Sequence, residues 1–201
     1  MKIGIMGGTF NPIHNAHLLI AEMAREEYGL DRVIFITDGN PPHKSANVTA
    51  KQRFEMTHIA IADNSAFEED DFEINRSEKS YTVNTLGYLK EKYPNDDLFF
   101  IIGEDSLNDF DKWYKPDKIL EMCSLLVFPR KSLKSLTETI KAVKEKMNGR
   151  IFPVSAPVFR ISSPDIRNRV KNGQTVRYML PENVRDYINK YHLYKENEND
   201  R

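Results

Sequence analysis

The chain has 201 residues, the size of one compact domain, and 40% of them are hydrophobic, which is enough to build a single core. The 29 lysines and arginines nearly balance the 30 aspartates and glutamates, so the composition excludes an overall basic field for nucleic acid and an acidic disordered chain. The single cysteine, Cys123, can form no intramolecular disulfide, and its apolar surroundings favour a buried structural thiol over a nucleophile.

Short runs of β-branched and aromatic residues alternate along the chain with longer segments whose apolar residues recur three and four apart. The expected strands are residues 2–6, 33–37, 72–75, 98–102, 125–128 and 151–154. The expected helices are residues 16–29, 51–62, 82–93 and 133–147. This alternation predicts an α/β fold with a doubly wound, mostly parallel, Rossmann-like sheet. We expect one domain over residues 1–201, whose polar end, 195–201, is a flexible tail.

The N-terminal residues 1–6 are too short for the apolar region of a signal peptide, and nowhere do about 18 apolar residues follow one another. Because the charges nearly cancel, any site for an anion must be local. We therefore expect a cytoplasmic protein that has neither a membrane nor a nucleic acid as its partner.

Polar and glycine-rich segments follow four of the expected strands. They are residues 7–17, 38–44, 103–114 and 129–132. Ligands of doubly wound sheets bind beyond the carboxyl ends of the strands, at the point where the strand order reverses. We therefore expect the functional site where these segments meet.

The glycines after the first strand indicate a close approach of the backbone to a ligand, and the helix expected next would direct N–H groups and a partial positive charge at that ligand. This combination suits phosphate. The glycines fall at Gly4, Gly7 and Gly8, which is not the G-x-G-x-x-G pattern, and the chain has no P-loop motif. A hydride-transfer enzyme and a P-loop nucleotidase are therefore disfavoured.

Two histidines, His14 and His17, stand three residues apart, so both can face one point if a helix begins near Asn15. A metal site would need a third protein ligand, and the sequence has no H-E-x-x-H motif. One capping and one core histidine is the alternative for an isolated pair. The position of the pair, directly after a glycine-rich strand end, favours donors to phosphate.

The segment GGTFNPIHNAH (7–17) resembles the (H/T)-x-G-H signature of the nucleotidylyltransferase superfamily, and ISSPDIR (161–167) resembles its second motif, I-S-S-T-x-I-R. Four further segments are similar to those of bacterial nicotinate-nucleotide adenylyltransferases: PPHK (41–44), SYT (80–82), LFFIIGEDS (98–106) and KWYK (112–115). The resemblance spans nearly the entire chain. It implies a nucleotidylyltransferase fold and the transfer of the adenylyl group of ATP to nicotinate mononucleotide, which yields nicotinate adenine dinucleotide and pyrophosphate in NAD biosynthesis.

The resemblance also implies roles toward ATP. His14 and His17 would hydrogen-bond the phosphates and stabilise the transition state. The implied ATP-binding residues are Gly7, Gly8, Thr9, Phe10, Asp105, Arg130, Ser162, Ser163 and Arg167. Within this set, Asp105 would lie near the ribose and Arg130 near the adenine. Without the first motif, the segment of residues 161–170 would equally fit an ordinary capped surface helix.

For the acceptor nucleotide, the resemblance implies Lys44 as the counter-charge of its phosphate and Trp113 as the stacking partner of its pyridine ring. The backbone near Tyr81 and Thr82 would meet the nicotinate carboxylate. From the sequence alone, Trp113 could instead be a core residue. Lys44 could instead be a solvated lysine, as single lysines on loops commonly are.

Three positions depart from the family pattern: Asn11 replaces Asp, Ala16 replaces Gly and Pro164 replaces Thr. Pro164 removes a backbone donor and a hydroxyl from the second motif. Proline is favoured at the first helical position, so a helix capped by Ser162 or Ser163 is still expected.

The triphosphate implies Mg²⁺, held mainly through phosphate oxygens, and the sequence shows no dedicated metal cage. The alternative functions are a phosphopantetheine adenylyltransferase, whose family is shorter and carries Thr in place of His14, and a non-catalytic protein that senses ATP. The sequence leaves a homodimer open.

Overall fold

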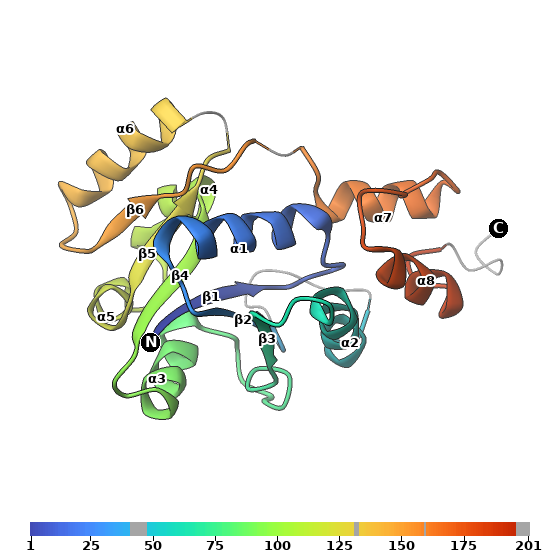
Figure 1. The fold of residues 1–201 in the computed structure, drawn as a ribbon, viewed down its shortest axis with the longest axis horizontal. Helices are drawn as coiled ribbons and strands as arrows, with labels where there is room; N and C mark the ends of the chain where they lie inside the picture. The colour runs from blue at the N-terminus through green and yellow to red at the C-terminus, as the bar shows by residue number, and fades with distance from the viewer. Residues whose placement is uncertain (41–47, 131–132, 159, 196–201) are drawn as a thin grey trace.

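A six-stranded parallel sheet forms the centre of the structure, a computed structural model in which residues 1–40, 48–130, 133–158 and 160–195 are described (Figure 1). The strands are β1 (Lys2–Gly8), β2 (Arg32–Thr37), β3 (Phe67–Asp70), β4 (Asp97–Gly103), β5 (Ser124–Phe128) and β6 (Ile151–Pro153). Their order is β3-β2-β1-β4-β5-β6, and every neighbouring pair is parallel. The order reverses beside β1, which pairs with both β2 and β4, so the doubly wound prediction is confirmed.

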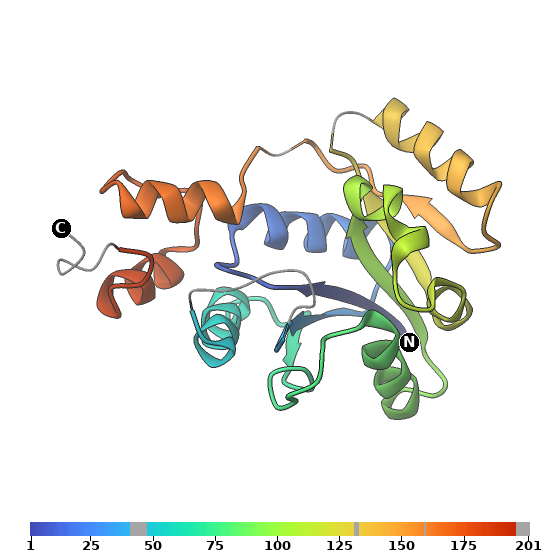
Figure 2. The same ribbon diagram turned by 180° about the vertical axis from the view of Figure 1, so that it is seen from behind.

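The described part of the chain has eight α-helices and a short 3₁₀ helix, η1 (Phe110–Lys112); α1 to α6 and η1 connect the strands, and α7 and α8 follow β6. The α-helices are α1 (Asn15–Tyr28), α2 (Ala50–Ile61), α3 (Thr82–Lys92), α4 (Glu104–Asn108), α5 (Pro116–Met122), α6 (Leu133–Lys144), α7 (Ser163–Lys171) and α8 (Glu182–Lys190). The four helices expected from periodicity are confirmed as α1, α2, α3 and α6. Seen from behind, α1 lies on one face of the sheet, while α3 and α5 lie on the other (Figure 2).

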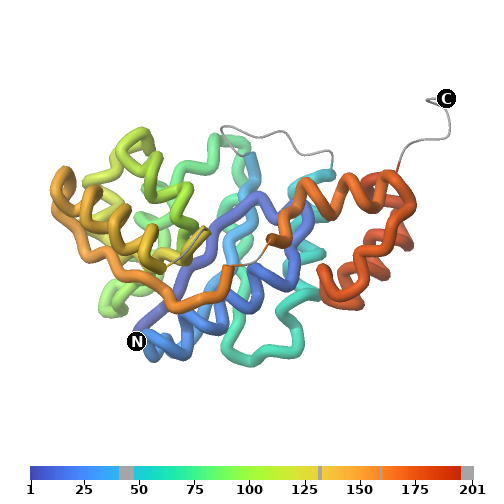
Figure 3. The backbone as a smooth tube through the Cα atoms, turned by 90° about the horizontal axis from the view of Figure 1, so that it is seen from above, coloured from blue at the N-terminus to red at the C-terminus, as the bar shows by residue number. Residues whose placement is uncertain are grey.

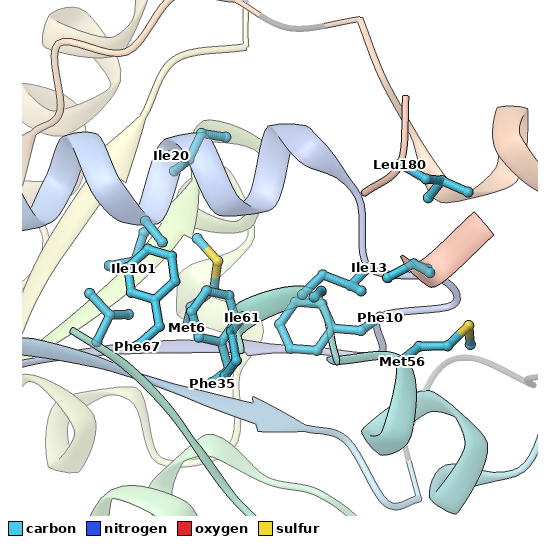
Figure 4. Close-up of a cluster of buried hydrophobic side chains, with 14 of the residues drawn as sticks. Met6, Phe10, Ile13, Ile20, Phe35, Met56, Ile61, Phe67, Ile101 and Leu180 are labelled. Atoms are coloured by element: carbon cyan, nitrogen blue, oxygen red, sulfur yellow. The ribbon is translucent and has the colours of Figure 1, made fainter. Parts of the chain in front are cut away.

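Two buried apolar layers fill the spaces between the sheet and these helices. Along β1, Ile3 and Ile5 face the layer shared with α3, α4, α5 and α6, whereas Met6 faces the layer shared with α1, α2, α7 and α8. Figure 4 shows the second layer, where Met6 and Phe35 of the sheet lie beneath Ile20 of α1. Because both faces of the sheet are covered, its central strands are apolar without alternation.

The first helix, α1, begins immediately after His14 and carries its buried residues Ala16, Ile20 and Ala24 at spacings of four. It ends at Gly29, whose φ of +60° is the left-handed conformation that glycine adopts without strain. Its N-terminus therefore lies at the carboxyl end of β1, next to the glycines.

The prediction of a strand at residues 72–75 is wrong. Those residues form a turn in which the Phe72 N–H donates to Asp70 Oδ1 at 2.9 Å, and the strand lies earlier, at Phe67–Asp70. The β3 sequence FEED has three acidic residues and little apolar alternation, which an edge strand tolerates because its outer side faces solvent.

Helices α7 and α8 lie together at the end of the molecule opposite α5 and α6 (Figure 3). The start of α7 lies beside the start of α1 (Figures 1 and 2). Of the expected tail, only Lys195 belongs to the described residues. Among the helices that the structure describes, none is both long and apolar enough to cross a membrane.

Cys123 lies in the interior between α5 and β5, and no part of its side chain reaches solvent. Burial raises the pKa of its thiol to about 12, which keeps it protonated at neutral pH. The expectation of a structural thiol is confirmed.

Candidate active site

A cavity of about 480 Å³ opens at the carboxyl end of β1, where the strand order reverses. Three segments far apart in the sequence line it: the loop after β1 with the first turns of α1, the end of β5, and the start of α7. Ten predicted residues line it: Gly7, Gly8, Thr9, Phe10, His14, His17, Arg130, Ser162, Ser163 and Arg167. The structure therefore brings the two sequence motifs together, as expected.

The loop after β1 turns sharply around Phe10, a non-glycine residue with a φ of +45°. The Phe10 ring covers Gly8, where a β-carbon would lie 3.0 Å from the ring. The Thr9 hydroxyl donates to Asp38 Oδ2 at 3.0 Å, which ties this loop to the end of β2. The backbone is thus held close to the cavity.

The two histidines are stacked at the start of α1, with ring centroids 3.7 Å apart and an interplanar angle of 15°. His14 is the N-cap residue, and its backbone N–H donates to His17 Nδ1 at 3.2 Å. Since Nδ1 of His17 accepts this bond, its proton in the neutral ring lies on Nε2. His17 can therefore present a donor from a ring whose position is set by the helix start.

His14 is buried, and within the described ranges its Nδ1 has no hydrogen-bond partner. Burial, assisted by the positive charge of Arg130, lowers the pKa of His14 to about 4. His14 is therefore neutral at pH 7 in the ligand-free protein. A buried polar atom without a partner in the lining of a cavity is suited to a ligand that supplies one.

The start of α7 is bonded to the first loop. Ser163 Oγ donates to the Pro12 carbonyl and Arg167 Nη1 donates to the Asn11 carbonyl, both at 2.8 Å. Ser162 is the N-cap residue, because its Oγ accepts the Asp165 N–H at 3.3 Å. Of the two serines expected as caps, Ser162 is the one that caps α7, so Pro164 is the second residue of the helix.

Arg130 faces the cavity from the end of β5. Its backbone N–H donates to the buried Glu104 carboxylate at 2.9 Å, and its Nε pairs with Asp105 Oδ2 at 3.2 Å. Asp105 is exposed and does not line the cavity, and its ion pair connects it to Arg130, which does.

Three of the residues expected to bind the acceptor, Tyr81, Thr82 and Trp113, belong to segments that the structure describes. The segments of Tyr81 and Trp113 meet, because the Tyr81 ring lies 4.9 Å from that of Tyr114. Thr82 is the first residue of α3. Trp113 is half-buried and packs at 5.2 Å from the Phe110 ring, so it also contributes to the core.

None of these three residues lines the large cavity, and Lys44 lies outside the described residues.

Sequence reasoning missed two residues that hold the first loop. The Tyr194 hydroxyl donates to Asn11 Oδ1 at 2.7 Å, and burial raises the pKa of this phenol. Arg53, on α2, donates to the Thr9 carbonyl at 2.5 Å. Periodicity offers no signal for either, because a lone arginine on an amphipathic helix is normally solvated and Tyr194 adjoins a polar tail.

The cavity-lining donors come from Thr9, His14, His17, Arg130 and Arg167, a set that suits phosphate oxygens. In the part of the chain that the structure describes, no group of three or more His, Cys, Asp or Glu side chains is arranged to hold a metal ion. That the protein has no metal ligands of its own, and that Mg²⁺ is held mainly by the phosphates, stays a prediction.

Parallel topology and a donor-lined cavity at the switch point define a nucleotide-binding α/β protein, and the family model for cytidylyltransferase-like proteins matches residues 5–169. Two curated relatives are named "Probable nicotinate-nucleotide adenylyltransferase". The protein from Desulfitobacterium hafniense (strain Y51) is 46% identical over 200 residues, and the match covers 96% of each chain. The protein from Citrifermentans bemidjiense is 41% identical over 212 residues, and the match covers 96% of this chain and 98% of the relative. The chain belongs to the nicotinate-nucleotide adenylyltransferase family.

A solved structure supports the fold independently. The nicotinic acid mononucleotide adenylyltransferase of Plasmodium falciparum, complexed with NaAD, superposes with a TM-score of 0.78 at 22% identity, and the match covers 96% of this chain and 97% of that one.

Proposed function

We propose that this chain transfers the adenylyl group of ATP to nicotinate mononucleotide, in NAD biosynthesis. A phosphate oxygen of the mononucleotide attacks the α-phosphorus of ATP, the bond to the β-phosphate bridging oxygen breaks, and nicotinate adenine dinucleotide and pyrophosphate result. The observation that carries this function is the meeting of the two motifs in one donor-lined cavity, in a chain with relatives of that name.

The attacking oxygen is already an anion, so the reaction needs no general base, and catalysis comes from alignment and from neutralising charge. Two features support this role for the histidines. His17 is oriented by the His14 backbone, with its proton on the far nitrogen, and His14 is a neutral ring with an unpartnered buried atom. Both would donate to phosphate oxygens as charge develops there.

The β- and γ-phosphates would lie against Gly7, Gly8, Thr9 and Phe10 on one side and the start of α7 on the other. There Ser162, Ser163 and the Arg167 guanidinium combine with the helix N-terminus, which favours anions. Arg130 would lie near the adenine. Asp105, paired with Arg130, would lie near the ribose.

For the acceptor, Trp113 would supply an aromatic face, and the segment of Tyr81 and Thr82 would supply backbone groups. Lys44 would provide the counter-charge for the acceptor phosphate. A pocket of backbone N–H groups favours a carboxylate over a carboxamide, whose own donors would need acceptors.

Nucleotidyltransferases generally use a divalent metal with ATP. The polar side chains in the cavity lining carry hydroxyl, imidazole, guanidinium and amide groups, which fit phosphate oxygens better than a metal ion. We infer that Mg²⁺ enters with the triphosphate, is held mainly through its oxygens and neutralises part of their charge.

Two broader features belong to the same proposal. Charged nucleotides do not cross membranes unaided, which supports a cytoplasmic location. The chain would act as one domain with a short tail, and light scattering of the purified protein decides between a monomer and a homodimer.

The test is a turnover panel in which ATP and Mg²⁺ are combined with nicotinate mononucleotide, nicotinamide mononucleotide, phosphopantetheine or no acceptor. We expect pyrophosphate and dinucleotide with nicotinate mononucleotide, at a kcat/KM about tenfold or more above that of the amide, the scale of leaving amide donors unpaired. Turnover with phosphopantetheine alone would identify that adenylyltransferase instead. ATP binding without any turnover would identify an ATP sensor.

A further inference from the structure

Arg53 is a charged side chain in the interior of the protein, on α2 and outside the cavity. Its exposure is 1%, and the other buried residues of α2 include the apolar Met56 and Ile61, which Figure 4 labels. Burial lowers its pKa and the nearby Asp38 carboxylate opposes that shift, but a guanidinium stays protonated in either case. The interior therefore contains a full positive charge.

The donors of Arg53 go to two loops and not to its own helix. Nη1 donates to the Thr9 carbonyl at 2.5 Å, and Nη2 donates to the Gly39 carbonyl at 3.5 Å. The planar fork of a guanidinium can hold two acceptors in a fixed relation, which a lysine ammonium on a flexible stem cannot do. Arg53 thus connects the loop after β1 with the loop after β2.

On the first loop, the contact fixes a donor that faces the other way. The Thr9–Phe10 peptide is trans, so its N–H points opposite to its carbonyl. Because the Thr9 carbonyl faces Arg53, the Phe10 N–H points away from Arg53, on a loop that lines the cavity. Phe10 also has the unusual φ of +45°, which surrounding contacts must maintain.

On the second loop, the contact reaches the acceptor side of the site. The Asn40 N–H donates to Ser80 Oγ at 3.2 Å, and the Ser80 N–H donates to the Asn40 carbonyl at 3.0 Å, directly before Tyr81. Gly39 lies so close to the chain at Glu73 that a β-carbon would be 2.0 Å from the Glu73 carbonyl oxygen. This loop is therefore packed tightly against the segment that leads to Tyr81.

A buried charge is a poor source of stability, because its desolvation commonly cancels the attraction it gains, and apolar replacements are often tolerated. The placement of Arg53 between the two loops calls for another explanation. We propose that Arg53 is a positioning residue for adenylyl transfer, whose guanidinium aligns the phosphate-facing Thr9–Phe10 peptide with the acceptor-side loop. This inference rests on the proposed function.

The test compares Arg53→Lys and Arg53→Met with Arg32→Met. Arg32 is the control: it is a partly buried arginine with one guanidinium nitrogen paired to Glu68 at 3.0 Å, and it stacks over Tyr93, away from the cavity. For each variant, kcat, both KM values, and the thermal midpoint are measured with nicotinate mononucleotide and Mg²⁺-ATP. Circular dichroism establishes that each variant is folded.

We expect kcat to fall by about 10- to 100-fold in Arg53→Met, the scale of misplacing a reacting group by about 1 Å, with smaller changes in either KM. Arg53→Lys, which can hold one carbonyl but not both, should recover part of that loss. Arg32→Met should lower the thermal midpoint and leave kcat unchanged.

Normal kcat in folded Arg53→Met would overturn the proposal. The proposal would also be overturned if Arg32→Met had the same thermal midpoint as Arg53→Met and lost as much kcat. It would be overturned as well if neither Arg53 variant folded, because Arg53 would then be a residue required for stability. Wild-type protein is assayed in parallel: if it makes no product, the proposed function fails before the role of Arg53 is reached.

Discussion

At the scale of single residues, the two histidines differ although they are three positions apart. His14 is buried and neutral with an unpartnered Nδ1, whereas His17 lies in the first turn of α1 and has its Nδ1 bonded to the His14 backbone. His14 therefore depends on its surroundings for its charge state, and His17 depends on the helix start for its orientation. The sequence showed the pair and its spacing, but the burial that separates their properties arises only in the folded chain.

Replacing His17 by alanine should leave the protein folded and lower kcat by about 10² or more, the usual scale for removing a donor to a transition state. His58→Ala is the control, because His58 lies on the exposed side of α2 and outside the cavity. Steady-state kinetics and circular dichroism decide the matter. Turnover near the wild-type value, or an unfolded protein, would contradict the role given to His17.

His14 should make the ligand-free protein less stable in mild acid. Its pKa is about 6.5 when unfolded and about 4 when folded, so the unfolded state binds more protons between those values. Its contribution is fully present above pH 6.5 and is lost as the pH falls toward 4, reaching about 3 kcal/mol at most. Urea unfolding from pH 7.5 to 4.5 should show a smaller loss for His14→Gln than for wild type. Equal losses would show that His14 is accessible to protons in the folded state.

At the scale of elements, the sequence predicted the central parts of the fold better than its edges. Strands β1, β2, β4 and β5 are apolar runs, and α1, α2, α3 and α6 are long and periodic, so local pattern sufficed. Strand β3 and helices α4, α5 and α8 were not predicted. They are short or rich in charge, and contacts with the rest of the molecule select them over their own propensities.

Much of the candidate site followed from the same patterns. Ten of the predicted residues line one cavity, because glycines, histidines and the second motif all follow strands or begin helices. Arg53 and Tyr194 were missed, since each acts on a loop more than 40 residues away along the chain. No local pattern encodes such a contact.

The bond from α7 to the first loop should matter for catalysis more than for stability. Ser163→Ala removes the hydrogen bond to the Pro12 carbonyl and should cost about 1 kcal/mol, or about fivefold in kcat/KM for ATP. Ser155→Ala is a matched control, because Ser155 also bonds a distant segment, at Glu27, away from the cavity. Equal kinetic effects of the two changes would show that the α7 contact has no special role.

At the scale of the whole molecule, the C-terminal part is joined to the first loop at several points. The Asn15 N–H donates to the Met179 carbonyl at 3.0 Å, and its side chain donates to the Tyr178 carbonyl at 2.7 Å. With Tyr194 on Asn11, these bonds place the α7–α8 unit over the start of α1. Asn11, where the family usually has Asp, supplies a neutral acceptor for that phenol.

Tyr194→Phe should therefore lower kcat while leaving the fold intact, since only the hydroxyl bond to Asn11 is lost. Tyr187→Phe serves as its control, because the Tyr187 hydroxyl bonds Glu55 on α2 and should affect stability alone. A drop of about fivefold is expected for one such bond. If both variants lose activity equally, the effect comes from the docking of α8 and not from the first loop.

The contact between Tyr194 and Asn11 spans 183 positions along the chain. During translation, Asn11 emerges 156 residues before Arg167 and 183 residues before Tyr194, the two residues that bond it in the folded structure. A nascent chain can thus form β1 and α1 without an assembled phosphate site. Because the start of α7 lines the cavity, we expect a chain that stalls before α7 to lack part of the phosphate site and to be catalytically silent.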